Sequence, residues 1–284
     1  MMTDNTTTTK NHDYSNFCRY LDIADLSHRF VAPRLEAWAL EQLKVLSTSI
    51  EKLSLGWASV TYQIRALNYA RLIQDKTLGH RIRTFVKLSY SYLLPNSLVT
   101  LRESSIPLER KTFLAMFKYP NLQKDHPSLF GFVFCVVLSL GHEFWLHQPL
   151  LTRDDRIMLL SAHALLTPLP FLKLELDWIE GTLSEANPHG SEPGPRSCAH
   201  CNFQATWKQY FSRGYYKELK GKQEPSGGVY SLSKLIAKRV LFADALDKLG
   251  EGCTNNCKIC FIEFVDEKIE RVFALFAEFY KEVE

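Results

Sequence analysis

The sequence contains no apolar run long enough to cross a lipid bilayer. Its longest run, LFGFVFCVVLSL at residues 129–140, has about a dozen residues, whereas a membrane-spanning helix needs about 20. The N-terminal residues MMTDNTTTTKNHD lack the basic and then apolar pattern of a secretory signal. We therefore expect no membrane span and no secretion, and we interpret residues 129–140 as a buried core helix.

Cysteine is sparse as well, with seven in 284 residues. A chain of this length with few cysteines and no secretory signal is typical of compartments that keep thiols reduced, so we expect the cytoplasm or the nucleus. The charge is nearly balanced, because 34 basic and 31 acidic residues leave a net charge of +3. That charge neither requires nor excludes nucleic acid as a partner.

Known catalytic and nucleotide-binding motifs are missing, including the G-x-x-x-x-G-K-[ST] and G-x-G-x-x-G loops. The sequence HEFWLH, from His142 to His147, resembles the H-E-x-x-H zinc motif but has one residue more. Two side chains five positions apart on a helix point about 140° apart, so they cannot share one ion. SLSK, beginning at Ser231, lacks the companion motifs of serine–lysine enzymes, and Ser231 is predicted to cap a helix instead. We predict that the protein is not an enzyme.

Strand signals are few, because hardly any stretch alternates apolar and polar residues between turns. Helical periodicity dominates, and one apolar face is formed by Leu35, Trp38, Ala39, Leu43 and Leu46. We predict a mostly α fold, with helices over residues 57–74, 77–93, 107–118, 128–146, 153–166, 170–183, 203–219, 231–249 and 261–282.

One segment is too rich in proline and glycine to form a helix. NPHGSEPGPRS, residues 187–197, holds three prolines and two glycines and is predicted to be a linker. It divides the chain into a disordered tail over 1–19, a helical domain over 20–186 and a cysteine-bearing helical module over 198–284.

The cysteine module contains two C-x-x-C pairs separated by 55 residues. This spacing lets two thiolates of each pair point at one ion, and two pairs complete the tetrahedron of a structural zinc site. The predicted ligands are Cys198, Cys201, Cys257 and Cys260. Cys253 is an alternate ligand, and His200 is a further candidate. Buried free cysteines, a redox pair or an iron–sulfur cluster remain as other interpretations.

Two further segments of the module suggest partners. Residues 207–239 carry eight basic and two acidic side chains, interleaved with aromatic residues. Such a segment can bind nucleic acid, or it can be a helix with an aromatic core face and a solvated basic face. The segment 261–283 repeats apolar residues at spacings of three and four, which indicates packing inside the domain or a homo-oligomer seam.

YLDIADLSHRFVAPRLEAWALEQLKVL, residues 20–46, resembles the helical segment that closes a BTB/POZ domain. The pattern A-D-x-x-x-R-F-x-x-P-R-L-x-x-W-A carries the resemblance. The chain from residue 20 onward resembles the region after the BTB core in basidiomycete fungal BTB proteins, through Cys198, Cys201, Trp207, Tyr210, Cys257 and Cys260.

The nineteen residues before this segment do not hold the mixed strand-and-helix core of a BTB/POZ domain, so the resemblance does not carry BTB dimerisation or cullin recruitment over to this chain. The resemblance implies an intracellular protein–protein interaction adaptor, here with a structural zinc site. The alternative is a nucleic-acid-associated zinc module that uses residues 207–239.

Overall fold

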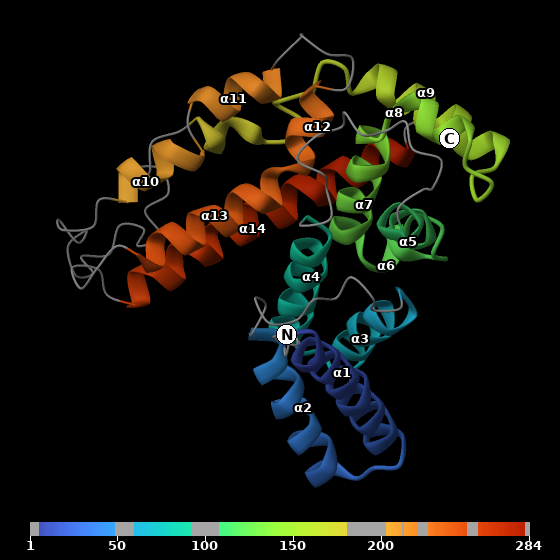
Figure 1. Cartoon of the computed structure of the whole chain (residues 1–284), viewed down its shortest axis with the longest axis vertical. Coiled ribbons are helices and arrows are strands. Elements are labelled where there is room, and N and C mark those ends of the chain that lie inside the picture. Colours follow the sequence, from blue (N-terminus) through green and yellow to red (C-terminus); the bar gives the residue numbers. More distant parts are fainter. Residues whose placement is uncertain are drawn as a thin grey trace, which may run out of the picture. The chain divides into compact units, whose positions relative to one another are not determined.

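The computed structural model describes residues 6–48, 60–91, 108–180, 203–211, 213–220, 227–248 and 255–281 (Figure 1). All regular elements in these ranges are helices, which confirms the predicted mostly α fold. Within the same ranges, no helix combines the length and the apolar composition needed to span a membrane. The chain divides into two compact units, residues 1–105 and 106–284, and each is considered by itself.

The first unit is built on a helical hairpin. α1 (Thr6–Arg29) and α2 (Pro33–Thr48) pack against each other, and α3 (Val60–Leu72) and α4 (Lys76–Ser91) pack on them. Pro33 is the first residue of α2, where its missing N–H is harmless. α1 begins at Thr6, inside residues 1–19, which the sequence predicted to be a disordered tail. The core of the unit contains Phe17, Leu21, Ala39, Leu43, Ile64, Leu67, Ile82 and Phe85.

The second unit is organised around the apolar run singled out above. It forms α7 (Pro127–Ser139), in which every residue from Ser128 onward is buried, so the predicted core helix is confirmed. Because α7 is apolar on all sides, it needs cover from several directions. α5 (Leu108–Phe117), α6 (Leu122–Asp125), α12 (Gly227–Ser233) and α14 (Asn255–Lys281) supply that cover.

The remaining described helices of this unit are α8 (Gly141–Leu146), α9 (Arg153–Leu165), α10 (Phe203–Tyr210), α11 (Arg213–Lys220) and α13 (Leu235–Asp247), with the short 3-10 helix η3 (Leu176–Ile179). α14 packs on α7 and on α13, and its apolar seam is buried at Val265, Ile269, Val272, Phe276 and Phe279. This seam therefore packs inside the unit.

The division into units differs from the predicted domains. The structure separates the chain near residue 105, whereas α12 and α14 pack on α7, which precedes the predicted linker. The described helices of residues 198–284 thus share one core with residues 108–180. Residues 187–197 lie outside the described part of the chain.

Candidate metal centre and interaction face

The two C-x-x-C pairs flank the beginnings of two helices. Cys201 precedes Phe203, the first residue of α10, by two positions, and the later pair lies in the first two turns of α14. Cys198, His200, Cys201 and Cys253 lie outside the described residues. Cys257 is described only as part of the helix, and Cys260 is half-buried and not in a disulfide.

α10 packs on α13, and the chain from α10 to α11 runs antiparallel to α13, as aromatic contacts show. The rings of Trp207 and Phe211 both lie against Phe242, with centroids 5.6 and 5.5 Å away. Further along the chain, in α11, the centre of the Tyr215 ring lies 5.2 Å from the ammonium of Lys238. Residue numbers rise from Trp207 to Tyr215 along this segment, while those of their contacts in α13 fall from Phe242 to Lys238. The beginning of α10 therefore lies toward the end of α13.

α14 is also antiparallel to α13. Arg239 donates two hydrogen bonds to Asp266, of 2.7 and 2.6 Å, and Lys258 Nζ lies 3.5 Å from the backbone oxygen of Asp247. The beginning of α14 therefore also lies beside the end of α13. Figure 1 shows the beginnings of α10 and α14 at the left of the view, at one end of the unit.

This arrangement brings the beginning of α10, which follows Cys201 in the sequence, and the beginning of α14 to the same end of α13. Two residues of chain span at most about 7 Å, which is the reach between Cys201 and the start of α10. Cys257 and Cys260 occupy the third and sixth positions of α14. The sequence predicted a helix from residue 261, and the helix instead begins at Asn255.

A thiolate near the beginning of a helix is stabilised by the positive end of the helix dipole and by unpaired backbone N–H groups. Cys257 lies in the first turn of α14, and Cys260 lies in the second. Among the side chains that the structure describes, no group of three or more His, Cys, Asp or Glu residues could hold a metal. Of the predicted ligand set, that search includes the side chain of Cys260 alone.

The histidines of HEFWLH do not form a site. α8 ends at Leu146, His142 and His147 are both exposed, and the His142 ring packs edge-on against Trp145. The sequence predicted that Ser231 caps a helix, and this prediction is wrong. Ser231 lies inside α12, and its backbone oxygen accepts a hydrogen bond from the Tyr215 hydroxyl.

Four aromatic residues of the basic segment belong to the core, and Tyr210 and Tyr230 are half-buried. Trp207, Phe211, Tyr215 and Tyr216 are almost completely buried, whereas Lys208 and Lys217 are exposed. Base stacking needs exposed aromatic rings, and these four rings do not offer them. The structure therefore matches the second interpretation of this segment, an aromatic core face with solvated cations.

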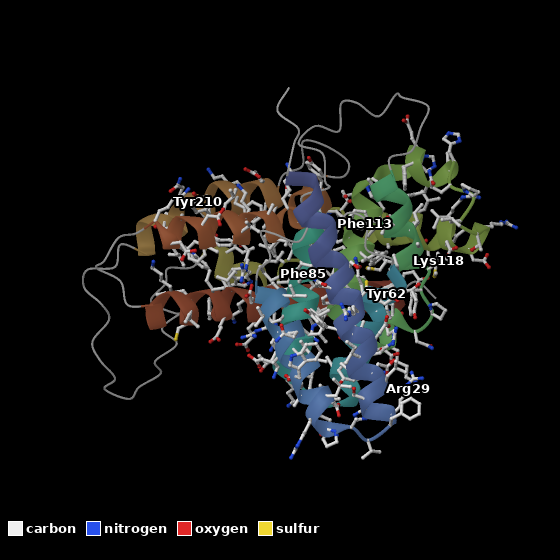
Figure 2. All side chains as sticks on the ribbon, turned by 60° about the horizontal axis from the view of Figure 1, so that its bottom comes forward. Arg29, Tyr62, Phe85, Phe113, Lys118 and Tyr210 are labelled. Carbon is white, nitrogen blue, oxygen red and sulfur yellow. The ribbon has the colours of Figure 1, made fainter. Side chains whose placement is uncertain are left out.

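The first unit exposes large apolar side chains along its hairpin, and we call this set of residues the hairpin face. Phe30 and Val31, at the turn between the helices, are 79% and 83% exposed. The other members are 46–52% exposed and are Leu26, Leu35, Trp38 and Val45. Figure 2 marks the end of α1, next to this turn, by Arg29.

Ion pairs and hydrogen bonds connect other residues of the hairpin with α3. The buried carboxylate of Asp25 accepts hydrogen bonds from Arg65 at 2.7 and 3.1 Å, and from Arg29 at 3.2 Å. Glu36 accepts a 2.8 Å bond from the Tyr69 hydroxyl. Burial and the neighbouring Glu36 raise the pKa of Tyr69 well above its ordinary value, so the phenol remains a donor. These bonds join α1 and α2 to α3 and leave the hairpin face outside.

The turn itself is held in an uncommon conformation. Val31 has φ 53°, a left-handed value that is unfavourable for a β-branched residue. The backbone N–H of Ala32 donates to Ser27 O at 2.8 Å and that of Val31 donates to His28 O at 3.3 Å. These bonds keep the Val31 side chain in solvent at the tip of the hairpin.

Comparison of the chain with protein-family models, with curated proteins and with solved structures gives no match.

Proposed function

We propose that this protein is a non-enzymatic protein-interaction adaptor whose second unit is closed by a structural zinc ion. The ligands are Cys198, Cys201, Cys257 and Cys260, with Cys253 as the alternate. The observation that carries the proposal is the antiparallel packing of α13 against both α14 and the segment that runs from α10 to α11. It puts the two helix beginnings that adjoin the cysteine pairs at one end of the unit.

The metal has a structural role in this proposal because four protein thiolates fill the tetrahedral shell and leave no position for water. The ion joins the segment before α10 to the beginning of α14. Without it, closure of a segment of 55 residues between the pairs depends on helix packing alone.

The adaptor role is supported by the hairpin face. From typical side-chain areas of roughly 150–250 Å² for large residues, its exposed fractions leave on the order of 600 Å² of apolar surface. The largest apolar patch on a typical monomer is about 300–600 Å² and is often functional. The BTB/POZ resemblance of residues 20–46, which contain the whole face, implies the same role.

Metal analysis of protein purified without chelators tests the zinc proposal. We expect one zinc per chain, and we expect Cys198→Ser and Cys260→Ser each to lose the metal and to unfold the second unit. Cys18→Ser, in α1 of the first unit, is the matched control and keeps the metal. A wild-type protein that is fully folded and free of metal contradicts the proposal.

Cross-linking with mass spectrometry in extracts tests the adaptor role. We expect cross-links to other polypeptides from Lys44, which precedes Val45 in the sequence and is paired with Asp75, and we expect their loss in Phe30→Glu. The contrary result is the absence of protein cross-links together with salt-sensitive binding to nucleic acid that Lys217→Glu abolishes. That result favours the nucleic-acid alternative over the adaptor role.

A further inference from the structure

We propose that the hairpin face binds a second copy of this chain, with the two α2 helices antiparallel across a two-fold axis near Trp38. This inference rests on the proposed interaction role of the face and names its partner. It depends on three observations, which are the area of the face, the order of charges along α2 and the position of the exposed turn.

The area suits a protein partner of standard size. The hairpin face offers on the order of 600 Å² of apolar surface, and a specific interface buries about 800 Å² on each side, including a polar rim. Exposed charged residues border the face, among them Arg29 and Arg34. An apolar centre with a polar rim is the usual arrangement of such interfaces.

The order of charges along α2 lets two antiparallel copies of this helix place opposite charges next to each other. Arg34, Trp38, Glu41 and Val45 follow one another at spacings of four, three and four, so they form one stripe of the helix, and all four are exposed. Arg34 lies about 6 Å before Trp38 along the axis and Glu41 lies about 4.5 Å after it.

A two-fold axis at Trp38 therefore brings Arg34 of each copy opposite Glu41 of the other. Parallel helices in register would instead place like charges opposite each other, which is unfavourable. The two-fold axis also makes the interface isologous, with the same patch used by both copies.

The exposed turn has a symmetry mate in the same arrangement. Val31 and Val45 are each seven residues from Trp38, on opposite sides, so Val45 of one copy meets the turn of the other. Phe30, next to Val31, extends the apolar contact. The left-handed backbone of Val31 keeps this side chain outside the unit, where a second copy can cover it.

Sedimentation velocity of the zinc-containing full chain over a range of concentrations tests the inference. We expect a reversible dimer whose dissociation constant rises at least tenfold in Arg34→Glu and in Glu41→Arg. The combined swap, Arg34→Glu with Glu41→Arg, restores opposite charges across the axis and is expected to recover the dimer. Lys76→Glu, an exposed change in α4, is the control and leaves the dimer intact.

A photo-reactive residue in place of Val45 gives a second readout. In a mixture of isotopically labelled and unlabelled chains, we expect cross-links between copies that map to the turn at Val31. A monomer at all concentrations, or a dimer unaffected by both single charge reversals, overturns the inference. A cross-link from Val45 to the second unit of the same chain, or to an unrelated protein alone, also overturns it. The last result leaves the adaptor proposal standing, and the zinc measurement is independent of both.

Discussion

Replacing Gly131 by alanine is expected to destabilise the second unit, because α7 and α14 touch backbone to backbone at this glycine. A Cβ atom built on Gly131 lies 1.8 Å from the backbone oxygen of Phe273 and 3.1 Å from the backbone nitrogen of Ala277. Neither of these atoms can rotate away as a side chain would. α14 must therefore shift by about 1.5 Å to make room for one methyl group.

The magnitude follows from two opposing effects. Overpacking of a close-packed core costs about 1–3 kcal/mol or more, and here a shift of α14 also opens gaps around the buried rings of Phe132 and Phe273. The better helix propensity of alanine returns about 1 kcal/mol. With the cost at the upper end of that range, we expect a net loss of about 2 kcal/mol in the free energy of unfolding.

Thermal unfolding followed by circular dichroism measures the effect. A loss of this size lowers the midpoint by roughly 4–8 °C for a unit of this length. Gly79→Ala in α4 is the matched control, because its Cβ meets only the Arg83 and Ala70 side chains, at 3.5 and 3.7 Å. We expect the control to be neutral or slightly stabilising. If Gly131→Ala melts at or above the wild-type temperature, the packing of α7 on α14 described here is incorrect.

Three further changes test other contacts. Arg239→Met removes the guanidinium from the buried carboxylate of Asp266 and is expected to cost about 3 kcal/mol in urea unfolding, most of it recovered when Asp266→Leu is added. Burial opposes ionisation of Asp155, but the bonds from Lys118 hold the pKa of that carboxyl below its ordinary value. The ionised Asp155 therefore stabilises the fold fully above its pKa in the unfolded chain, near 4, and this stabilisation is lost as the pH falls through its lower pKa in the folded protein. In Asp155→Asn, the free energy of unfolding in urea should fall less steeply with decreasing pH on the acid side. Burial raises the pKa of the Cys135 thiol, so this cysteine is expected to react with a thiol reagent at pH 8 only after unfolding, and labelling of the native protein contradicts its burial.

Features that depend on neighbouring residues could be predicted from the sequence. The capping box before α9 is one, because Thr152 and Asp155 exchange their hydrogen bonds within four residues. The helix over residues 129–140 is another, since its composition alone requires burial. The mostly α fold follows from the same local signals.

Features that depend on distant contacts could not be predicted. The unit boundary near residue 105 arises because α14 covers α7, and no local signal links Gly131 to Phe273. The apolar positions of α2 span more than one face. Ala39 and Leu43 are buried, whereas Trp38 remains exposed, and the periodicity does not distinguish these two sides.

For the candidate metal centre, the C-x-x-C spacing predicts the ligands but not their neighbourhood. The order of α10, α13 and α14 at one end of the unit depends on tertiary contacts, such as Arg239 with Asp266. The beginning of α14 at Asn255 was also missed, because the heptad pattern starts several residues later than the helix.

X-ray absorption at the zinc edge of the purified full chain tests the central claim most directly. We predict one zinc per chain with a single shell of four sulfur atoms at about 2.3 Å, and loss of this signal in Cys260→Ser. A shell of nitrogen or oxygen ligands, or the absence of zinc from a folded chain, would contradict the closure of the second unit by its two cysteine pairs.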